Sequence, residues 1–229
     1  MARDGSIGVW RALNGALIQS LRLPQWPTHI AISRDGSRVA AISEHRDAAV
    51  WRVADGILLE TVKGADNLVR NSFIRFSPND VAQIIGETDS WSGVGIWNVA
   101  GQKQVTDFEK PDDEKNGVSE VAFSPDGQVL AAAYGFGNIH LWNLASGQKL
   151  RSIGPVGSEI TALIFSPKGD LVVAGYADHW VRVWRLSDGK NLQVLKGHTS
   201  EVQNLAFSSD GKLLATASGD VMVRLWGVR

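Results

Sequence analysis

Tryptophan recurs along this chain with a nearly constant period. Six of the nine tryptophans lie 41 to 46 residues apart, namely Trp10, Trp51, Trp97, Trp142, Trp184 and Trp226. A period in the forties is typical of proteins built from stacked copies of one supersecondary unit. The fold must therefore place the same kind of unit side by side several times.

Each unit contains short apolar runs separated by turns. The first run ends in Ser, as in HIAIS, VAFS and LAFS, and the turn after it carries Gly36, Gly127, Gly169 or Gly211. Asp-Gly and related turns favour antiparallel hairpins, because glycine accepts the positive φ that tight turns demand. A run of small apolar residues, a run ending at the periodic Trp and a more polar run follow. Four strands in about 42 residues leave no room for a helix, so we expect each unit to be a four-stranded antiparallel sheet.

Sheets of this kind stack radially as the blades of a propeller. We therefore expect an all-β protein, a β-propeller of about five four-stranded antiparallel blades. The small residues of the second run, as in RVAAIS and LLATAS, let neighbouring sheets approach each other closely. A β-sandwich is the alternative, but it gives no reason for six tryptophans and their turns to stay in phase.

The last repeat carries a more specific pattern. Residues 196–226, KGHTSEVQNLAFSSDGKLLATASGDVMVRLW, resemble the WD-repeat (β-transducin repeat) family, and weaker copies cover essentially the whole chain. The resemblance implies a hydrogen-bonded structural tetrad made of His198, Thr216, Asp220 and Trp226. In such a tetrad the indole N–H donates to the Thr hydroxyl, the hydroxyl to one imidazole nitrogen, and the other imidazole N–H to the carboxylate.

The other repeats depart from this pattern. Asp178 keeps its place before Trp184, but Val156 and Ala174 stand at the His and Thr positions. We expect the fold to survive these losses, because packing builds the blades, and we expect individual blades to be less stable.

Counting strands raises the question of ring closure. Residues 1–21 supply a partial unit of two strands, four complete units follow, and the last unit has three, which makes twenty-one strands. We expect a single β-propeller domain over residues 1–229, with units ending near Trp51, Trp97, Trp142, Trp184 and Trp226. Either five blades close, with residues 16–21 completing the last blade and DGSIGVW surplus, or the chain is an arc of a larger ring. Because open sheet edges invite association, we favour closure in five blades or by self-association. The surplus strand suggests an excerpt of a longer protein.

Composition excludes several classes of partner. The chain has 23 Lys and Arg residues against 24 Asp and Glu, so it offers no basic footprint for nucleic acid or an anionic membrane. It contains no cysteine, which removes disulfides, thiolate catalysis and Cys-ligated zinc. No run approaches the ~20 apolar residues of a membrane span, and no signal peptide is evident. We expect a cytoplasmic protein.

No pattern of catalytic residues emerges. Phosphate-binding loops, nucleophile elbows and zinc-protease motifs are absent from the sequence, and the five histidines stand apart. The acidic stretch at residues 107–114 lacks the ligand spacing of a calcium loop, so we interpret it as a solvated loop. We expect no enzymatic activity, no metal and no cofactor.

Aromatic residues gather in loops that a propeller places on one face. The candidates for binding are Trp26, Trp91, Trp180, Tyr134, Phe136 and Tyr176, with Arg46 as a polar contact. Aromatic side chains on a rigid loop surface are typical of binding hot spots. The alternative is that they cover a neighbouring blade or the mouth of the channel.

The resemblance therefore implies a non-enzymatic scaffold that mediates protein or peptide binding. An alternative is a regulatory or sensor propeller arm of a larger multidomain signalling protein. An enzyme with its site in the central channel is a third possibility. The first strands that would line such a channel are almost wholly apolar or small, which makes a poor catalytic lining.

Overall fold

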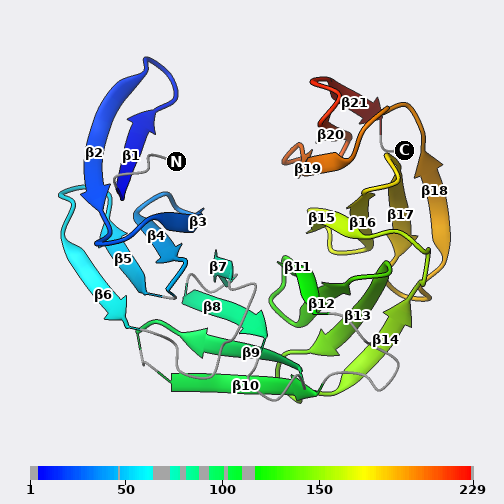
Figure 1. Cartoon of the computed structure of the whole chain (residues 1–229), viewed down its shortest axis with the longest axis horizontal. Coiled ribbons are helices and arrows are strands. Elements are labelled where there is room, and N and C mark those ends of the chain that lie inside the picture. The colour runs from blue at the N-terminus through cyan, green and yellow to red at the C-terminus, as the bar shows by residue number, and fades with distance from the viewer. Residues whose placement is uncertain are drawn as a thin grey trace. The chain divides into compact units, whose positions relative to one another are not determined.

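The computed structural model describes residues 5–227, apart from residue 46 and residues 64–72, 78–80, 88–92, 101–102 and 110–116. The described residues form twenty-one β-strands in antiparallel sheets, each sheet made of consecutive strands of the chain (Figure 1). Four of these sheets have four strands. The prediction of an all-β fold built from four-stranded antiparallel units is confirmed. The chain divides into two compact units, residues 1–110 and 111–229.

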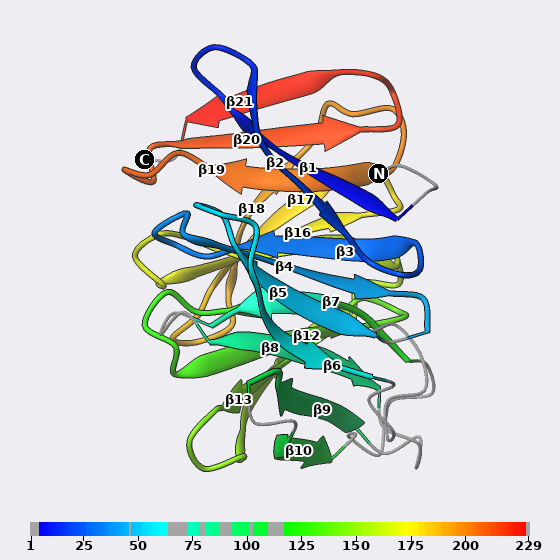
Figure 2. The same ribbon diagram turned by 90° about the vertical axis from the view of Figure 1, so that its left-hand side faces the viewer.

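The first unit contains ten strands. A two-stranded sheet pairs β1 (Ser6–Arg11) with β2 (Ala16–Arg22). The next sheet contains β3 (Pro27–Ile32), β4 (Arg38–Ser43), β5 (Ala48–Arg52) and β6 (Leu58–Val62), and Figure 2 shows β3 and β4 running antiparallel within it. The third contains β7 (Phe73–Phe76), β8 (Ala82–Glu87), β9 (Gly93–Asn98) and β10 (Lys103–Glu109).

The second unit contains eleven strands in three sheets. The first is made of β11 (Val118–Phe123), β12 (Val129–Tyr134), β13 (Asn138–Asn143) and β14 (Lys149–Ile153). The second is made of β15 (Ile160–Phe165), β16 (Leu171–Tyr176), β17 (Val181–Arg185) and β18 (Asn191–Leu195). The last described sheet has three strands, β19 (Val202–Phe207), β20 (Leu213–Ser218) and β21 (Val223–Gly227).

The described part of the DGSIGVW segment belongs to an ordinary strand. Residues 6–11 form β1, which pairs with β2 from Ser6 opposite Arg22 to Arg11 opposite Ala16. The five-bladed alternative, in which residues 16–21 complete the last blade, would require β2 to exchange this partner. Ring closure stays a prediction.

The turn between the first two strands of a sheet shows why the Ser-x-Asp-Gly pattern recurs along the chain. In the β19–β20 turn, Gly211 has a φ of 71° and its N–H donates to the Ser208 carbonyl at 2.9 Å. The Ser208 hydroxyl donates to Asp210 at 2.6 Å and accepts from the Leu213 N–H at 3.0 Å. Side chain and backbone therefore hold the hairpin together, and only glycine adopts this φ without strain.

The periodic tryptophans share one register. Trp51, Trp142, Trp184 and Trp226 face Val39, Leu130, Val172 and Leu214 on the second strands of their sheets. In the complete sheets the pairing of the third and fourth strands shifts by one residue just before the Trp, as between Leu141 and Trp142. Such a bulge re-aims the side chain that follows it.

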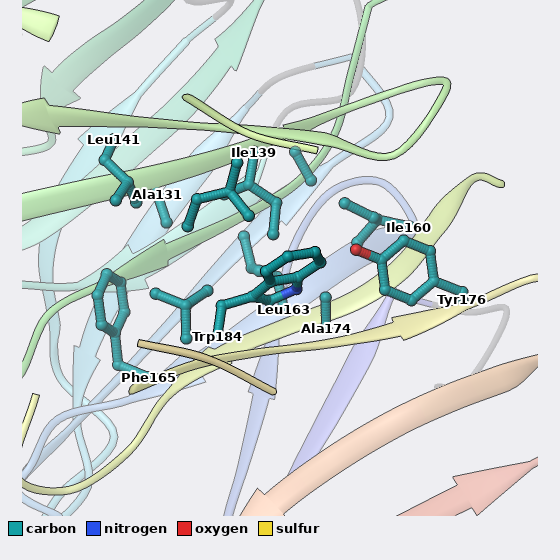
Figure 3. Close-up of a cluster of buried hydrophobic side chains, with 12 residues drawn as sticks. Ala131, Ile139, Leu141, Ile160, Leu163, Phe165, Ala174, Tyr176 and Trp184 are labelled. Carbon is teal, nitrogen blue, oxygen red and sulfur yellow. The ribbon is translucent and has the colours of Figure 1, made fainter. Parts of the chain in front are cut away.

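Small residues on the second strands bring neighbouring sheets together. Ala131, Ala132, Ala133 and Ala174 are completely buried. A Cβ placed on Gly175 of β16 would lie 2.6 Å from Val202 Cγ1 on β19 of the next sheet. Figure 3 shows how the larger side chains then fill the space between sheets, with Ile139 and Leu141 facing Leu163 and Trp184. Packing, more than polar contacts, therefore builds the stack.

Candidate functional site

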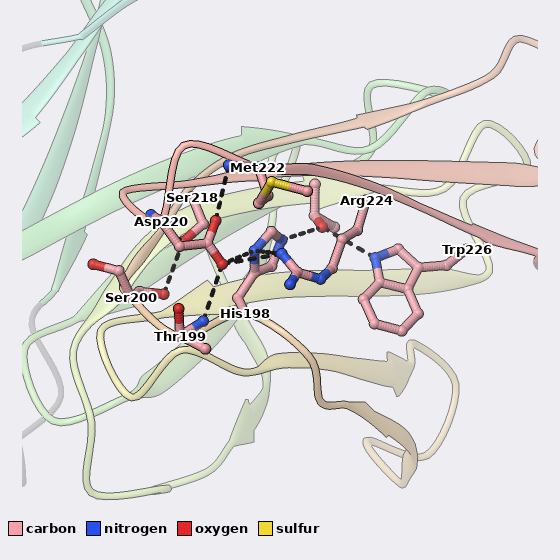
Figure 4. A network of polar contacts seen from close by, with 9 residues as sticks. His198, Thr199, Ser200, Ser218, Asp220, Met222, Arg224 and Trp226 are labelled. Carbon is pink, nitrogen blue, oxygen red and sulfur yellow. Dashed lines mark hydrogen bonds and ion pairs between the residues drawn. The ribbon is translucent and has the colours of Figure 1, made fainter.

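The last sheet holds the four residues of the predicted tetrad together (Figure 4). His198 lies in the loop between β18 and β19, and its Nε2 is 2.7 Å from the Thr216 hydroxyl. The Trp226 indole N–H donates to the same hydroxyl at 3.0 Å. On the other side of the ring, His198 Nδ1 is 2.9 Å from the Asp220 carboxylate. Three polar links thus connect β20, β21, the turn between them and the loop before β19.

Asp220 ties the β20–β21 turn to this network. Its carboxylate accepts hydrogen bonds from the backbone N–H groups of Thr199 and Met222, both at 3.0 Å. Its partial removal from water acts to raise the pKa of Asp220, but the hydrogen bonds from His198, Thr199 and Met222 together hold that pKa well below its usual range. Asp220 is therefore ionised at neutral pH and fixes the turn as an anion.

Arg224 joins the network, which the sequence analysis did not foresee. Its guanidinium Nη1 lies 3.0 Å from Asp220 and 2.7 Å from His198 Nδ1. A single ring nitrogen cannot donate to Asp220 and accept from Arg224 at once. With the proton on Nδ1, the ring donates to Asp220 and Thr216 donates to Nε2. With the proton on Nε2, Arg224 donates to Nδ1 and the ring donates to Thr216.

The preceding sheet lacks half of this network, as expected from Val156 and Ala174. Ala174 pairs with Arg182 in the register that Thr216 shares with Arg224. Without a hydroxyl at residue 174, the buried indole N–H of Trp184 has no hydrogen-bond partner among the described residues. The departures from the family pattern therefore leave a polar atom unsatisfied.

Two of the predicted binding residues belong to the core, so that prediction was wrong for them. Tyr134 is 1% exposed and Tyr176 is fully buried. They are the last residues of β12 and β16. The Tyr134 ring centre lies 5.2 Å from that of His140 and 6.4 Å from that of Trp142, both on β13, and Tyr176 belongs to a buried cluster with Ile139 and Ile160. Burial raises the pKa of the Tyr176 hydroxyl to about 12, against an opposing effect of the nearby Arg182 charge. Neither side chain can reach a partner.

Other predicted binding residues do lie at the surface. Phe136 is 62% exposed in the β12–β13 turn. Trp180 is half-buried at the end of the β16–β17 turn. Trp26 of the first unit is 51% exposed before β3. Trp91 and Arg46 fall outside the residues that the structure describes.

Two exposed apolar residues of the β20–β21 turn were not among the binding residues predicted from the sequence, which were aromatic residues and Arg46. Val221 and Met222, in the β20–β21 turn, are 94% and 53% exposed. Val221 has a φ of 59°, a conformation that a β-branched residue seldom adopts. They occupy the turn that corresponds to those of Phe136 and Trp180 in the two preceding sheets.

Within the described ranges, no three His, Asp or Glu side chains gather as a metal site would require. The same part of the chain contains no helix long and apolar enough to cross a membrane.

Comparison with known families finds two matches along the chain. The profile described as WD domain, G-beta repeat matches residues 189–227, which contain the tetrad. The profile described as Anaphase-promoting complex subunit 4 WD40 domain matches residues 90–166.

Several known proteins are similar to this chain. It is 26% identical to Apoptotic protease-activating factor 1 of Rattus norvegicus over 69% of this chain and 13% of the relative. It is 33% identical to Eukaryotic translation initiation factor 3 subunit I of Aspergillus terreus over 46% of this chain and 29% of the relative. It is 40% identical to Small ribosomal subunit protein RACK1y of Oryza sativa subsp. japonica over 34% of this chain and 23% of the relative. The chain thus spans less than a third of the length of each.

Domains built from WD40 repeats are typically scaffolds for protein interaction and are generally non-catalytic. The family matches agree with the repeated four-stranded sheets and with the tetrad of the last repeat. This chain therefore belongs to the WD40-repeat family.

Proposed function

We propose that this chain is a non-enzymatic scaffold that binds a protein or peptide through one set of turns in its second unit. The carrying observation is that the equivalent turns of three successive sheets present the exposed Phe136, the half-buried Trp180, and the exposed Val221 and Met222. We call these four residues the turn face. Exposed apolar side chains on a rigid frame are the usual material of binding hot spots.

The turns that carry these residues are internally braced. In each turn a backbone N–H donates to the carbonyl of the strand residue three positions earlier. These bonds join Gly137 to Tyr134 at 2.9 Å, His179 to Tyr176 at 3.2 Å and Val221 to Ser218 at 3.1 Å. A surface that is already ordered loses little conformational entropy when a partner binds, which favours affinity.

Peptide selection tests the proposal directly. Peptides selected from a random phage-displayed library on the wild-type chain are measured by calorimetry against Phe136→Ser and Met222→Ser. We expect each variant to weaken binding by at least about tenfold, as truncation of a hot spot does. The matched control is Leu150→Ser on β14, because Leu150 and Met222 are both 53% exposed. Equal losses in the control, or selected peptides that ignore both turn variants, would refute the proposal.

A regulatory or sensor arm of a larger protein is the second candidate. It is favoured by the similarity to the two Apoptotic protease-activating factor 1 sequences, of which this chain spans 13%. The full-length coding sequence tests it, since a catalytic or nucleotide-binding domain on the same chain is required.

We propose further that both units belong to one propeller domain, closed either in five blades or by self-association. Light scattering of the 24.8 kDa chain over a range of concentrations distinguishes these arrangements. A persistent monomer favours five blades, and a stable dimer favours two arcs that complete one another. A cytoplasmic location and independence of any cofactor complete the proposal, and imaging of the tagged full-length product tests the location.

A further inference from the structure

Asp178 keeps a strong partner although its sheet lacks the His and Thr of the tetrad. The Arg182 guanidinium donates to both oxygens of the Asp178 carboxylate, at 3.1 and 2.6 Å. Arg182 is only 7% exposed. A buried guanidinium requires a paired anion, and the two-pronged geometry fixes both side chains relative to each other. The pair therefore joins the β16–β17 turn to strand β17.

Arg182 also contacts two aromatic rings. Its guanidinium carbon lies 4.4 Å from the ring centre of Tyr176 and 5.2 Å from that of Trp180. The Lys196 ammonium lies 4.1 Å from the centre of the same Trp180 ring. Cations over aromatic rings attract them, and the planar guanidinium stacks as well. Trp180 is therefore held by two cations from different parts of the sheet.

The backbone of Trp180 is tied to the same carboxylate. Its N–H donates to Asp178 at 3.2 Å, and its carbonyl accepts from the Tyr176 N–H at 3.0 Å. The Asp178 carboxylate thus accepts hydrogen bonds from both the Arg182 guanidinium and the Trp180 backbone N–H. Since Arg182 also contacts the Trp180 ring, the Asp178–Arg182 ion pair fixes both the ring and the main chain of Trp180.

The last sheet contains the same pair without the aromatic residue. Arg224 donates to Asp220 at 3.0 Å, and Met222 stands at the place of Trp180. There His198 and Thr216 also engage Asp220 and the strand. The last sheet thus has both devices, and the sheet of β15–β18 has only the ion pair.

We propose that the Asp178–Arg182 pair replaces the missing His and Thr at the turn end of its sheet, and that Arg182 is a positioning residue for the Trp180 side chain on the turn face. The ion pair does not replace the hydrogen bond to the tryptophan, because the Trp184 indole N–H remains without a partner among the described residues. The use of Trp180 in binding rests on the proposed function, whereas its fixed orientation does not.

Fluorine NMR of the chain labelled with 5-fluorotryptophan tests this proposal without any partner. The Trp180 signal is assigned by its loss in Trp180→Phe. In Arg182→Lys, which keeps the charge but loses the planar fork, we expect the Trp180 signal to move by more than its linewidth. Lys196→Ala should also move it, and this exposed residue can be replaced without disturbing the fold. Arg224→Lys is the matched control and should leave the Trp180 signal in place.

The outcomes separate orientation from binding. A Trp180 signal that stays within its linewidth in Arg182→Lys, while the melting temperature falls, makes the pair purely structural and overturns the positioning role. If Arg182→Lys fails to fold, an unchanged signal in Lys196→Ala overturns the proposal that the cations on the Trp180 ring position it. A signal that moves in both variants, together with selected peptides that ignore Trp180→Phe, upholds the positioning of Trp180 and removes it from the binding surface.

Discussion

The tetrad of the last sheet predicts how two conservative substitutions of Thr216 differ in stability. Packing alone would make Thr216→Val the more stable variant, whereas the hydrogen bonds of the tetrad should make Thr216→Ser the more stable one. Thr216 is 1% exposed, and its hydroxyl meets both Trp226 Nε1 at 3.0 Å and His198 Nε2 at 2.7 Å. Thr216→Val keeps the shape of the side chain and removes the hydroxyl. Thr216→Ser keeps the hydroxyl and removes a methyl group.

The two substitutions should differ in cost. A buried polar group left without its partner costs roughly 1–3 kcal/mol, and Thr216→Val strands two such groups. Trp226 is partly exposed, so water relieves part of its loss, and we expect a total of about 2–4 kcal/mol. Thr216→Ser should cost about 1 kcal/mol, the value of one buried methyl group. Serine should therefore be the more stable replacement.

Urea unfolding followed by far-ultraviolet circular dichroism measures this order. With a slope of roughly 1–3 kcal/mol per molar urea, the two variants should be separated by about a third of a molar or more. Thr199→Val is the matched control, because Thr199 is exposed and contributes its backbone N–H to Asp220. It should change stability by less than about 0.5 kcal/mol. A Thr216→Val chain as stable as Thr216→Ser would show that the hydrogen bonds add nothing to packing.

Three further predictions concern other parts of the fold. Gly175→Ala should lower the free energy of unfolding by about 1–3 kcal/mol, because the added methyl group would contact Val202. Val202→Ala should partly rescue this loss. If the losses of the two single variants, measured by urea unfolding, simply add in the double variant, the close approach of Gly175 and Val202 is contradicted. Val221→Asn should raise the free energy of unfolding by about 1 kcal/mol, because asparagine tolerates the positive φ that strains valine; a lower urea midpoint would show that no strain is stored there. Hydrogen bonds, first from the Ser33 hydroxyl, lower the pKa of Asp35 from 3.8 to about 2, so its stabilising effect is present above about pH 4 and is lost as pH falls towards 2. Asp35→Asn should flatten the acid side of the stability profile, and an equally steep profile in this variant would show that Asp35 is not responsible.

The fold was readable from the sequence because its signals are local. Glycine turns and periodic tryptophans act within a few residues of each strand, so twenty-one strands were predicted and twenty-one are found among the described residues. Residues 1–21 were expected to supply two strands, and the structure has β1 at Ser6–Arg11 and β2 at Ala16–Arg22. The tetrad was equally accessible, since the resemblance supplied both the residue types and their spacing.

The candidate binding residues were less readable because their exposure depends on the neighbouring sheet. Tyr134 and Tyr176 end their strands beside a turn, and only the packed structure shows that both side chains are buried. Arg182 and Arg224 carried a usable signal, since each follows a turn Asp by four residues and precedes a Trp by two. Arginine on a strand usually faces solvent, so the spacing alone does not indicate burial. The strain at Val221 leaves no trace in the sequence at all.

Each described sheet is made of consecutive strands, and this arrangement also bears on how the molecule forms. No described sheet requires a segment from a distant part of the chain, so each can assemble as soon as its own strands have left the ribosome. Short loops close with little loss of entropy, and contacts between near neighbours speed folding. Synthesis from the N-terminus would thus let the described sheets form one after another, in the order in which they follow along the chain.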